Sequence, residues 1–438
     1  MKKALFEGDK VLKILVIVNI LNIMCMLLGQ SFAKIRYILL IIDFLMIMFC
    51  EEEKILPILF FMHPNSALYD NIGFTYLFNI TVTIGAIRLF FKNINKIEKK
   101  AFALFVLVLG WELILILKSG LIDKSLLSLV SWISSYLVLI ILSKNQKFDF
   151  STVYKYFFIG FICAFFAGLT IPLKRFGLSF PTAYRFTGLL RDPNYYSMDA
   201  ILLIFGAGCY AKLNNKNQII YMVIIFAMGI CSVSKMFIAL FAIGCLLKVI
   251  YECKKVKISR IFIGLLILSI IVYIVYATGF LNMFLEKYLY RTETTSLFTG
   301  RDDLFSYYIN EIFSSPTNLL FGNSALKYSR VLNPSDINSF FQNFVAHNTY
   351  LDIILAWGIL GAIIYIFFVK TVYGNAKKAN ENKQISKNIY YNVTIILFII
   401  GLFTLSYLTT DVFALIILYL IALKYSIKNY KIEEVYQN

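Results

Sequence analysis

Two arginines stand in a polar segment just before a long apolar stretch, in the sequence Arg185-Phe-Thr-Gly-Leu-Leu-Arg191-Asp-Pro193-Asn194. The guanidinium group presents a planar fork of N–H donors that matches phosphate oxygens. Pro193 restricts the residue before it to extended geometry, and Asn194 is therefore expected to cap the next helix. We predict that Arg185 and Arg191 bind a phosphate group. The alternative is that they contact lipid headgroups or anchor the helix.

Three further clusters contain groups suited to anion binding or proton transfer. They are Ser232-Val-Ser234-Lys235, Gly300-Arg301-Asp302-Asp303 and His347-Asn348-Thr-Tyr350-Leu351. Lys235 is expected at the membrane edge, where it contacts phosphate or simply extends its ammonium group to the interface. Arg301 precedes an expected helix, whose N-terminus favours anions, although a helix start with exposed charges would look the same. His347 is expected to act as a general base, and the alternative is a capping or interfacial histidine.

Several carboxylates occur within or near the apolar stretches, where they are costly and usually face the interior of a bundle. They are Asp43, Glu112, Asp199 and Asp411. Glu112 is expected to pair with an arginine, or to relay protons if the protein is a transporter. The second histidine, His63, is expected to be structural. No Gly-Lys pair and no HExxH motif occurs, so neither an ATP-binding loop nor a metal site nor any cofactor is predicted.

The elements that must position these residues are long apolar stretches with almost no charge. Hydrophobic residues make up 60% of the 438 residues, and the mean hydropathy is +0.75, whereas soluble domains are about 45–50% apolar. A helix of about 20 residues crosses a hydrocarbon core of about 30 Å and satisfies its own backbone hydrogen bonds there. We therefore expect an all-α, polytopic transmembrane helix bundle that forms a single integral membrane domain over residues 1–438.

The net charge of +17 is explained by short loops between the apolar stretches, so no nucleic-acid partner is expected. Lys and Arg gather in these loops as the positive-inside rule describes for cytoplasmic segments. The segments are residues 1–13, 88–100, 252–260, 370–387 and 424–431. We predict that all of them, and therefore both termini, lie in the cytoplasm.

About 12 to 14 spans are expected from the lengths of the apolar stretches. The ranges are 11–29, 36–50, 72–90, 101–118, 122–142, 153–172, 195–213, 218–233, 236–251, 260–280, 348–369, 390–408 and 411–424. Parity also requires residues 55–62 to cross, or to enter and turn back, although this run is short. Residues 281–347 are expected to form an external loop that packs over the outer face with short amphipathic helices, one of them near residues 302–313.

In their order and topology, these clusters resemble the O-antigen polymerase and O-antigen ligase superfamily. The resemblance rests on Arg185-x-x-Gly188 and Asp192-Pro193-Asn194 before a span, the Ser-x-Ser-Lys turn at residues 232–235, Gly300-Arg301 in the external loop, and His347-Asn348-x-Tyr350-Leu351 followed by Gly358 and Gly361. It covers roughly residues 180–365. Lys235 departs from the family, in which an arginine is common at that position.

The resemblance implies a metal-independent glycosyltransferase in the cytoplasmic (inner) membrane of a bacterium, which acts on polyprenyl-diphosphate-linked oligosaccharides at the outer face. A polymerase moves the growing O-antigen or capsule chain onto the next lipid-linked repeat unit, and a ligase moves it onto a lipid A core or a protein. The implied catalytic residues are His347, Arg301 and Arg191, and the implied substrate-binding residues are Arg185, Lys235, Asn194, Asn348 and Tyr350.

A flippase and a chain-length regulator are the further partners that such a polymerase would have. The rival class is a transporter, either a lipid-linked oligosaccharide flippase or a secondary carrier. Transporters often have inverted repeats and helices that break near the midplane. No repeat is evident in this sequence, and its polar clusters map to one face, which favours the enzyme. The sequence does not separate polymerase from ligase, or identify the sugar and its linkage.

Overall fold

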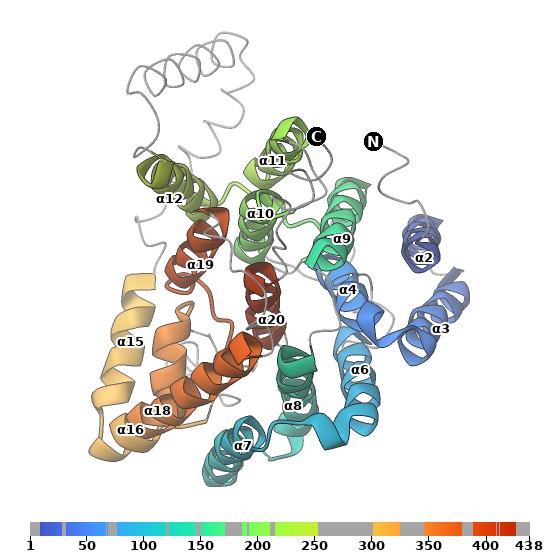
Figure 1. Cartoon of the computed structure of the whole chain (residues 1–438). Helices are drawn as coiled ribbons and strands as arrows, with labels where there is room; N and C mark the ends of the chain where they lie inside the picture. Colours follow the sequence, from blue (N-terminus) through green and yellow to red (C-terminus); the bar gives the residue numbers. More distant parts are fainter. Residues whose placement is uncertain are drawn as a thin grey trace.

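Helices are the only regular secondary structure among the residues that the computed structural model describes (Figure 1). The described residues are 9–28, 32–66, 68, 77–119, 122–145, 150–170, 186–190, 192–210, 215–252, 301–324, 346–378, 389–408, 410 and 412–425. Four helices within them are long and apolar enough to cross a membrane: Lys10–Leu28, Lys99–Lys118, Phe150–Leu169 and Thr349–Lys378. The predicted helical class is therefore confirmed, and the full number of spans stays a prediction.

The helices follow the expected apolar stretches closely. They are α2 (Lys10–Leu28), α3 (Ala33–Phe49), α4 (Glu52–Met62), η2 (His63–Asn65), α6 (Leu77–Asn93), η3 (Ile94–Lys96), α7 (Lys99–Ser119), α8 (Ile122–Asn145), α9 (Phe150–Thr170), α10 (Pro193–Ala207), α11 (Asn215–Ile230), α12 (Lys235–Glu252), α15 (Arg301–Phe313), α16 (Pro316–Phe321), α18 (Thr349–Lys378), α19 (Ile389–Gly401) and α20 (Val412–Tyr425). The expected span at 260–280 and most of the loop at 281–347 lie outside the described residues.

One predicted span is too long. Residues 390–408 were expected to be one helix, but α19 ends at Gly401 and residues 402–408 are not helical. The carbonyl of Leu402 accepts a hydrogen bond from the backbone N–H of Thr349 at 2.8 Å. A distant segment therefore satisfies a backbone group that a continued helix would have used internally, and the chain is free to leave the helix.

Residues 52–68 pass along α9 rather than turning back. Three contacts mark their path in order: Lys54 Nζ lies 5.5 Å from the centre of the Tyr156 ring, the Asn65 amide donates to the Gly160 carbonyl at 3.0 Å, and Leu68 shares a buried cluster with Ala164 and Ala167. The backbone of Phe61 can approach α9 closely because Gly160 has no side chain, since a Cβ there would lie 2.4 Å from the Phe61 carbonyl oxygen. The short helix α4 and η2 thus run along α9 in one direction, and whether residues 55–62 cross the membrane stays a prediction.

The core of the bundle surrounds α20, which lies among α4, α8, α10 and α18 in Figure 1. Its Tyr419 is fully buried, and its ring centre lies 5.3 Å from that of Phe150 and 5.4 Å from that of Phe60. Large aromatic side chains bury much apolar area, so the high aromatic content of this chain serves packing at the centre of the bundle.

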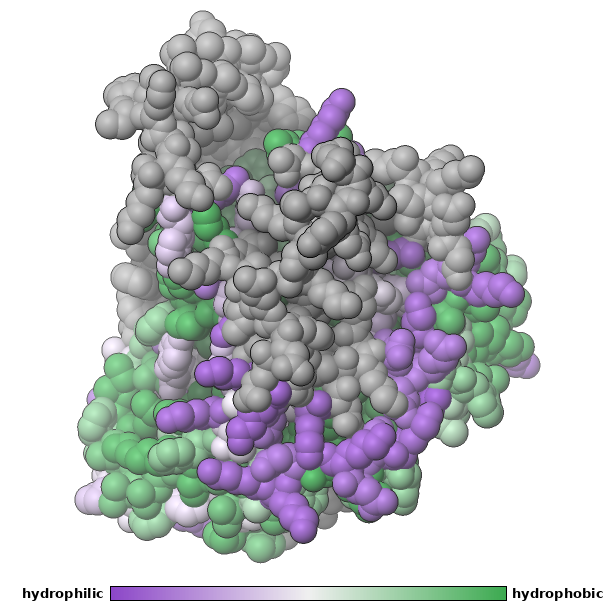
Figure 2. All heavy atoms as spheres, in the orientation of Figure 1, coloured by the Kyte–Doolittle hydropathy of each residue, from purple (hydrophilic) through white to green (hydrophobic). Residues whose placement is uncertain are grey.

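The described parts of the basic loops meet at one end of the bundle, which we call the lysine-rich end. Lys92 pairs with Glu52 at 2.9 Å, and the Asn375 amide donates to Glu98 at 3.3 Å. Lys424 lies 4.4 Å from the ring centre of a tyrosine in α18. In Figure 2, hydrophilic residues form a band over the region that α18, α8, α6, α4 and α2 occupy in Figure 1. The described parts of residues 1–13, 88–100, 370–387 and 424–431, which were expected to share one side of the membrane, thus share one end of the bundle.

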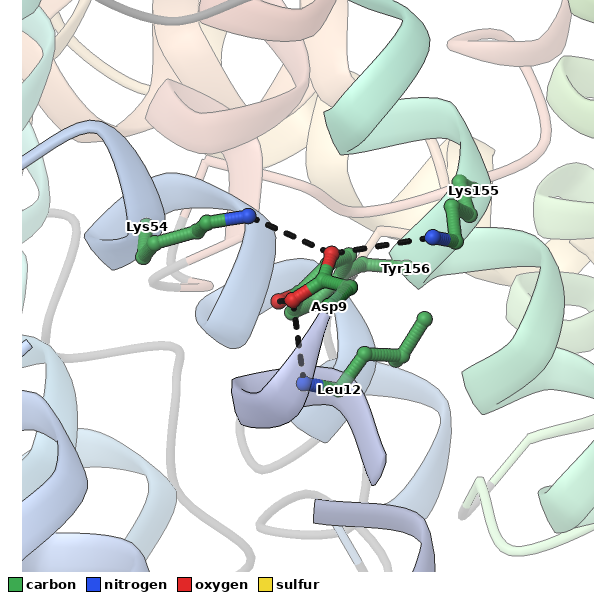
Figure 3. Close-up of polar contacts among 5 residues, drawn as sticks. All are labelled: Asp9, Leu12, Lys54, Lys155 and Tyr156. Atoms are coloured by element: carbon green, nitrogen blue, oxygen red, sulfur yellow. Dashed lines mark hydrogen bonds and ion pairs between the residues drawn. The ribbon is translucent and has the colours of Figure 1, made fainter. Parts of the chain in front are cut away.

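Asp9 joins three helices at this end (Figure 3). Its carboxylate accepts a hydrogen bond from the Tyr156 hydroxyl at 2.8 Å, and it lies 3.2 Å from Lys54 Nζ and 3.6 Å from Lys155 Nζ. The backbone N–H of Leu12 also donates to it at 3.3 Å, which caps α2. Burial alone would raise the pKa of Asp9, but the Tyr156 hydrogen bond, the charge of Lys54 and the Leu12 N–H together lower it below 3.8.

Asp9→Asn should therefore lower stability in a pH-dependent way. A carboxylate whose folded pKa is depressed stabilises the fold above its unfolded pKa, and this contribution is lost as the pH falls through the folded value. Because solvent screens this cluster, we expect a loss of about 1 kcal/mol at neutral pH. Thermal unfolding in detergent measures it, and the gap between wild type and Asp9→Asn should close as the pH falls below 3.8. A gap that stays constant with pH would contradict this role of the charge.

Candidate functional site

The first part of the site is the start of α10. Asp192 is extended, with φ −130° and ψ 132°, as its position before Pro193 predicts. Its carboxylate accepts a hydrogen bond from the backbone N–H of Asn194 at 2.6 Å. The expectation that Asn194 caps α10 is therefore wrong, because Asp192 is the cap and Asn194 already lies in the first helical turn. The side chain of Asn194 is left available for contacts with another helix.

Asn194 uses this freedom to bind the turn before α12. Its side-chain oxygen accepts a hydrogen bond from the Ser234 hydroxyl at 2.9 Å. One turn further along α10, the hydroxyls of Ser197 and Ser232 are 2.9 Å apart. Both serines of the Ser-x-Ser-Lys motif are fully buried in this contact, and Lys235 begins α12 beside them in a half-buried position. Two clusters that are about 40 residues apart in sequence thus form one unit.

The third part of the site is the start of α18. His347 is half-buried and has a φ of 50°, which L-residues rarely adopt. Asn348 follows it and caps the helix, since its side-chain oxygen accepts hydrogen bonds from the backbone N–H groups of Tyr350 at 3.0 Å and Leu351 at 3.2 Å. The Asp352 carboxylate accepts from a backbone N–H just before the histidine at 3.2 Å. The left-handed backbone at His347 is therefore stabilised by hydrogen bonds to the residues before and after it.

Residues 402–408 join these parts together, and we call them the linking segment. Three hydrogen bonds make the connection: the Tyr195 hydroxyl donates to the Ser406 carbonyl at 2.6 Å, the Thr349 hydroxyl donates to the Leu405 carbonyl, and the Thr404 hydroxyl contacts the Met236 sulfur. Each partner follows a motif residue directly, because Tyr195 follows Asn194, Met236 follows Lys235 and Thr349 follows Asn348. The linking segment was missed from the sequence, although Thr404 and Ser406 interrupt an apolar stretch there.

The helix that begins after His347 is broken in its middle. Gly358 has φ 65° and ψ −175°, so α18 is two helices joined at this residue. Residues 322–324 fill the break, where the backbone N–H groups of Asn323 and Ser324 donate to the carbonyls of Leu355 and Ala356 at 2.9 and 2.8 Å. The carbonyls of Leu355 and Ala356, which the break would leave unpaired, are therefore satisfied by residues 322–324, which lie within the loop expected over residues 281–347.

Glu112 of α7 stabilises the same break from the other side. Its carboxylate accepts a hydrogen bond from the Ser324 hydroxyl at 2.6 Å and another from the Trp357 indole N–H at 2.7 Å, and its side chain is 1% exposed. The neighbouring Trp111 donates to the carbonyl of Trp357 at 3.2 Å. Glu112 was expected to pair with an arginine or to relay protons, and it instead accepts hydrogen bonds from a hydroxyl and an indole that hold residues 322–324 against α18.

Of the three predicted arginines, the structure describes only Arg301, and only its backbone. Arg185 and Arg191 lie outside the described residues, and only the backbone of Arg301 is described, as the first residue of α15. The expected amphipathic helix near residues 302–313 is present. Three of its residues, Leu304, Tyr308 and Ile312, share a buried cluster with Ala346 and Leu355, whereas Ile309 is 43% exposed. Arg301 thus begins a helix that packs beside the residue before His347.

Two other predicted residues have contacts within the protein. The Tyr350 hydroxyl donates to the Ile399 carbonyl at 2.8 Å. His63 Nε2 lies 3.1 Å from Asp199 Oδ2, and both side chains are buried, which agrees with the structural role that was expected for this histidine. No group of three or more His, Cys, Asp or Glu residues that could hold a metal ion occurs among the described residues.

These contacts define a helical bundle of the membrane class with motif residues from distant segments gathered at the end away from the lysine-rich loops. Neither a protein-family model nor a curated protein matches this sequence. The function must therefore be argued from the residues and their arrangement alone.

Proposed function

We propose that this protein is a membrane-embedded glycosyltransferase that polymerises a bacterial surface polysaccharide. It transfers a glycan from its polyprenyl-diphosphate carrier onto the next lipid-linked repeat unit, at the outer face of the cytoplasmic membrane. The observation that most supports this proposal is the linking segment, which contacts the residues next to Asn194, Lys235 and Asn348. Three of the four motifs that resemble the O-antigen polymerase and ligase superfamily thus have a residue beside this one segment, which supports the proposal.

The chemistry requires a cationic site for the leaving group and a base for the acceptor. In our proposal Arg185, Arg191 and Arg301 bind the diphosphate, because fixed guanidinium groups stabilise the charge that develops on it. The acceptor hydroxyl gives its proton to His347 while its oxygen attacks the anomeric carbon of the donor sugar. The bond between that carbon and the diphosphate oxygen breaks, and the electron pair leaves with the diphosphate.

The local fold suits these roles. The left-handed backbone at His347 is stabilised by the Asn348 cap and by the Asp352 carboxylate. The position from which the imidazole side chain extends is therefore fixed. The start of α15 packs near Ala346, which brings the backbone of Arg301 toward the same region. Lys235, Asn348 and Tyr350 remain proposed substrate contacts. Asn348 also caps the start of α18, and the Tyr350 hydroxyl donates to the Ile399 carbonyl in α19.

A transporter is the second candidate, and one observation favours it. The break of α18 at Gly358, next to the buried Glu112, resembles the discontinuous helices that transporters use at their substrate sites. Here, however, residues 322–324 satisfy the backbone groups of the break, which leaves less for a substrate to bind. An enzyme needs no gradient, whereas a carrier makes no new glycosidic bond.

The test is polymerisation by purified protein in detergent supplied only with lipid-linked repeat units. We expect a ladder of products without any membrane gradient, and a ladder from one substrate also separates polymerase from ligase, which needs a different acceptor. Arg191→Lys, Arg301→Lys and His347→Ala should each lower the rate at least about 100-fold, the usual scale for an electrostatic or acid–base group. Arg88→Lys, at the lysine-rich end, is the matched control. Normal ladders from all three variants would reject the site.

A further inference from the structure

A buried arginine outside the predicted site has no acidic partner among the residues that the structure describes. Arg36 lies in the first turns of α3 and its side chain is 7% exposed. Its Nε donates to the Asn22 side-chain oxygen at 2.8 Å, and its Nη2 donates to the Leu68 carbonyl at 2.8 Å. Both partners are neutral. A buried guanidinium is costly and is normally paired with a negative charge.

The described residues offer no carboxylate for this purpose. The carboxylate on the same face of α3 is Asp43, which is seven residues further and therefore about 10 Å along the helix axis. No ion pair of Arg36 with a described residue is found within 4 Å. The two hydrogen bonds use two of the five N–H donors of a guanidinium group, so a planar edge of the fork is left for an anion.

Further polar groups lie near Arg36, and apolar side chains are exposed on the outer faces of α2 and α3. Asn19 lies one turn before Asn22 on α2, and both polar atoms of its amide are buried without a hydrogen-bond partner. Lys34 is exposed in the first turn of α3. The outer faces of α2 and α3 expose large apolar side chains, including Leu28 at 62% and Ile38 at 58%. A lipid whose head group binds Arg36 could therefore place its chain along these faces.

Arg36 also lies at the same end of the bundle as the candidate site. The Leu68 carbonyl that it binds belongs to a residue in a buried cluster with Ala164, Ala167 and Leu189. Leu189 is two residues before Arg191, in the turn that leads to α10. The α2–α3 hairpin is thus connected through Leu68 to the segment that is proposed to bind the diphosphate.

We infer that Arg36 binds the diphosphate of a polyprenyl-linked lipid that enters between the α2–α3 hairpin and the bundle. The site would receive either the incoming donor or the released carrier before it leaves, and so it rests on the proposed function. The anion supplies the negative charge that the described protein residues do not, and the neutral partners Asn22 and Leu68 orient the guanidinium without neutralising it.

The test measures binding rather than turnover. Full-length protein in nanodiscs of phosphatidylcholine is titrated with undecaprenyl diphosphate, and occupancy is read by native mass spectrometry. The titration is done on an Arg191→Lys, Arg301→Lys background, which weakens the proposed catalytic diphosphate site. On this background we expect Arg36→Gln to weaken binding at least about tenfold, and Arg36→Lys to weaken it less, because the ammonium retains the charge but loses the fork. The control is Arg88→Gln, whose guanidinium donates to the carbonyls of Ile47 and Cys50 near the other end of α3, and it should leave binding unchanged.

Two comparisons make the result decisive. Undecaprenol, which lacks the phosphates, should bind wild type and Arg36→Gln equally. Phosphatidylglycerol should compete weakly, and if Arg36→Gln reduces its binding as much as that of the diphosphate, Arg36 is a general headgroup anchor and the inference is overturned. Unchanged diphosphate binding in a folded Arg36→Gln protein also overturns it. Loss of binding in Arg36→Gln, together with a wild type that makes no polymer, would instead reject the proposed function and leave the lipid site standing.

Discussion

Replacing Gly358 with alanine should cost at least about 3 kcal/mol of stability, or prevent accumulation of the folded protein. The backbone of Gly358, at φ 65° and ψ −175°, lies in a region that is essentially restricted to glycine and costs other residues about 1–3 kcal/mol. An added Cβ would also lie 2.4 Å from the carbonyl oxygen of Leu320 and 2.5 Å from the nitrogen of Phe321. Because both neighbours are backbone atoms, they cannot move aside without displacing α16.

The measurement is the free energy of unfolding in detergent, with expression in membranes as a second readout. Gly374→Ala is the matched control, because it lies in the same helix and an added Cβ would meet nothing within 4 Å. A helical glycine replaced by alanine usually gains about 0.5–1 kcal/mol, so the two variants should change stability in opposite directions. Equal stability of Gly358→Ala and wild type would show that the break in α18 is not required.

Glu112→Leu should be the second most damaging of these changes, with an expected loss of about 3 kcal/mol. The substitution leaves the Trp357 indole N–H and the Ser324 hydroxyl without the acceptor that lies 2.7 and 2.6 Å from them. Each buried unsatisfied group costs about 1–3 kcal/mol. Residues 322–324 would then lose the contact of Ser324 with α7, so the proposed polymerisation should fall together with stability.

A double-mutant cycle tests the cause. Trp357→Phe removes the donor, and on the Glu112→Leu background it should cost clearly less than it does in the wild type, because the hydrogen bond is already absent. Glu53→Ala is a control for the loss of a carboxylate, since Glu53 is exposed in α4. Additive effects of the two changes would mean that Glu112 acts through some other contact.

The sequence predicts the helices well because the apolar stretches that cross a bilayer are long and nearly free of charge. It also predicts the local backbone conformation at some positions. Asp192 is extended before Pro193, and α15 begins at Arg301 with Leu304 and Tyr308 on its buried face. These features depend on residues that are close together in the chain, and they can therefore be read from spacing alone.

The partners of the polar residues could not be predicted in this way. Glu112 binds Trp357, which is 245 residues away, and no periodic pattern links the two. Asn194 looked like a helix cap because asparagine is a favoured N-cap residue, but Asp192 takes that position and Asn194 binds Ser234 instead. Arg36 gave no signal because a single charge near the end of an apolar stretch is ordinary in membrane helices. Only its neutral surroundings in the fold make it unusual.

We propose that a diphosphate binds among arginines from separate segments, near His347, at the end of the bundle away from the lysine-rich loops. The most direct measurement is an electron cryomicroscopy structure of the full-length protein in nanodiscs with undecaprenyl diphosphate. We predict that guanidinium nitrogens of Arg191 and Arg301 lie about 3 Å from phosphate oxygens, with the imidazole of His347 facing the same cavity. A diphosphate bound at the lysine-rich end, or arginines that face away from one another on unconnected surfaces, would contradict the account.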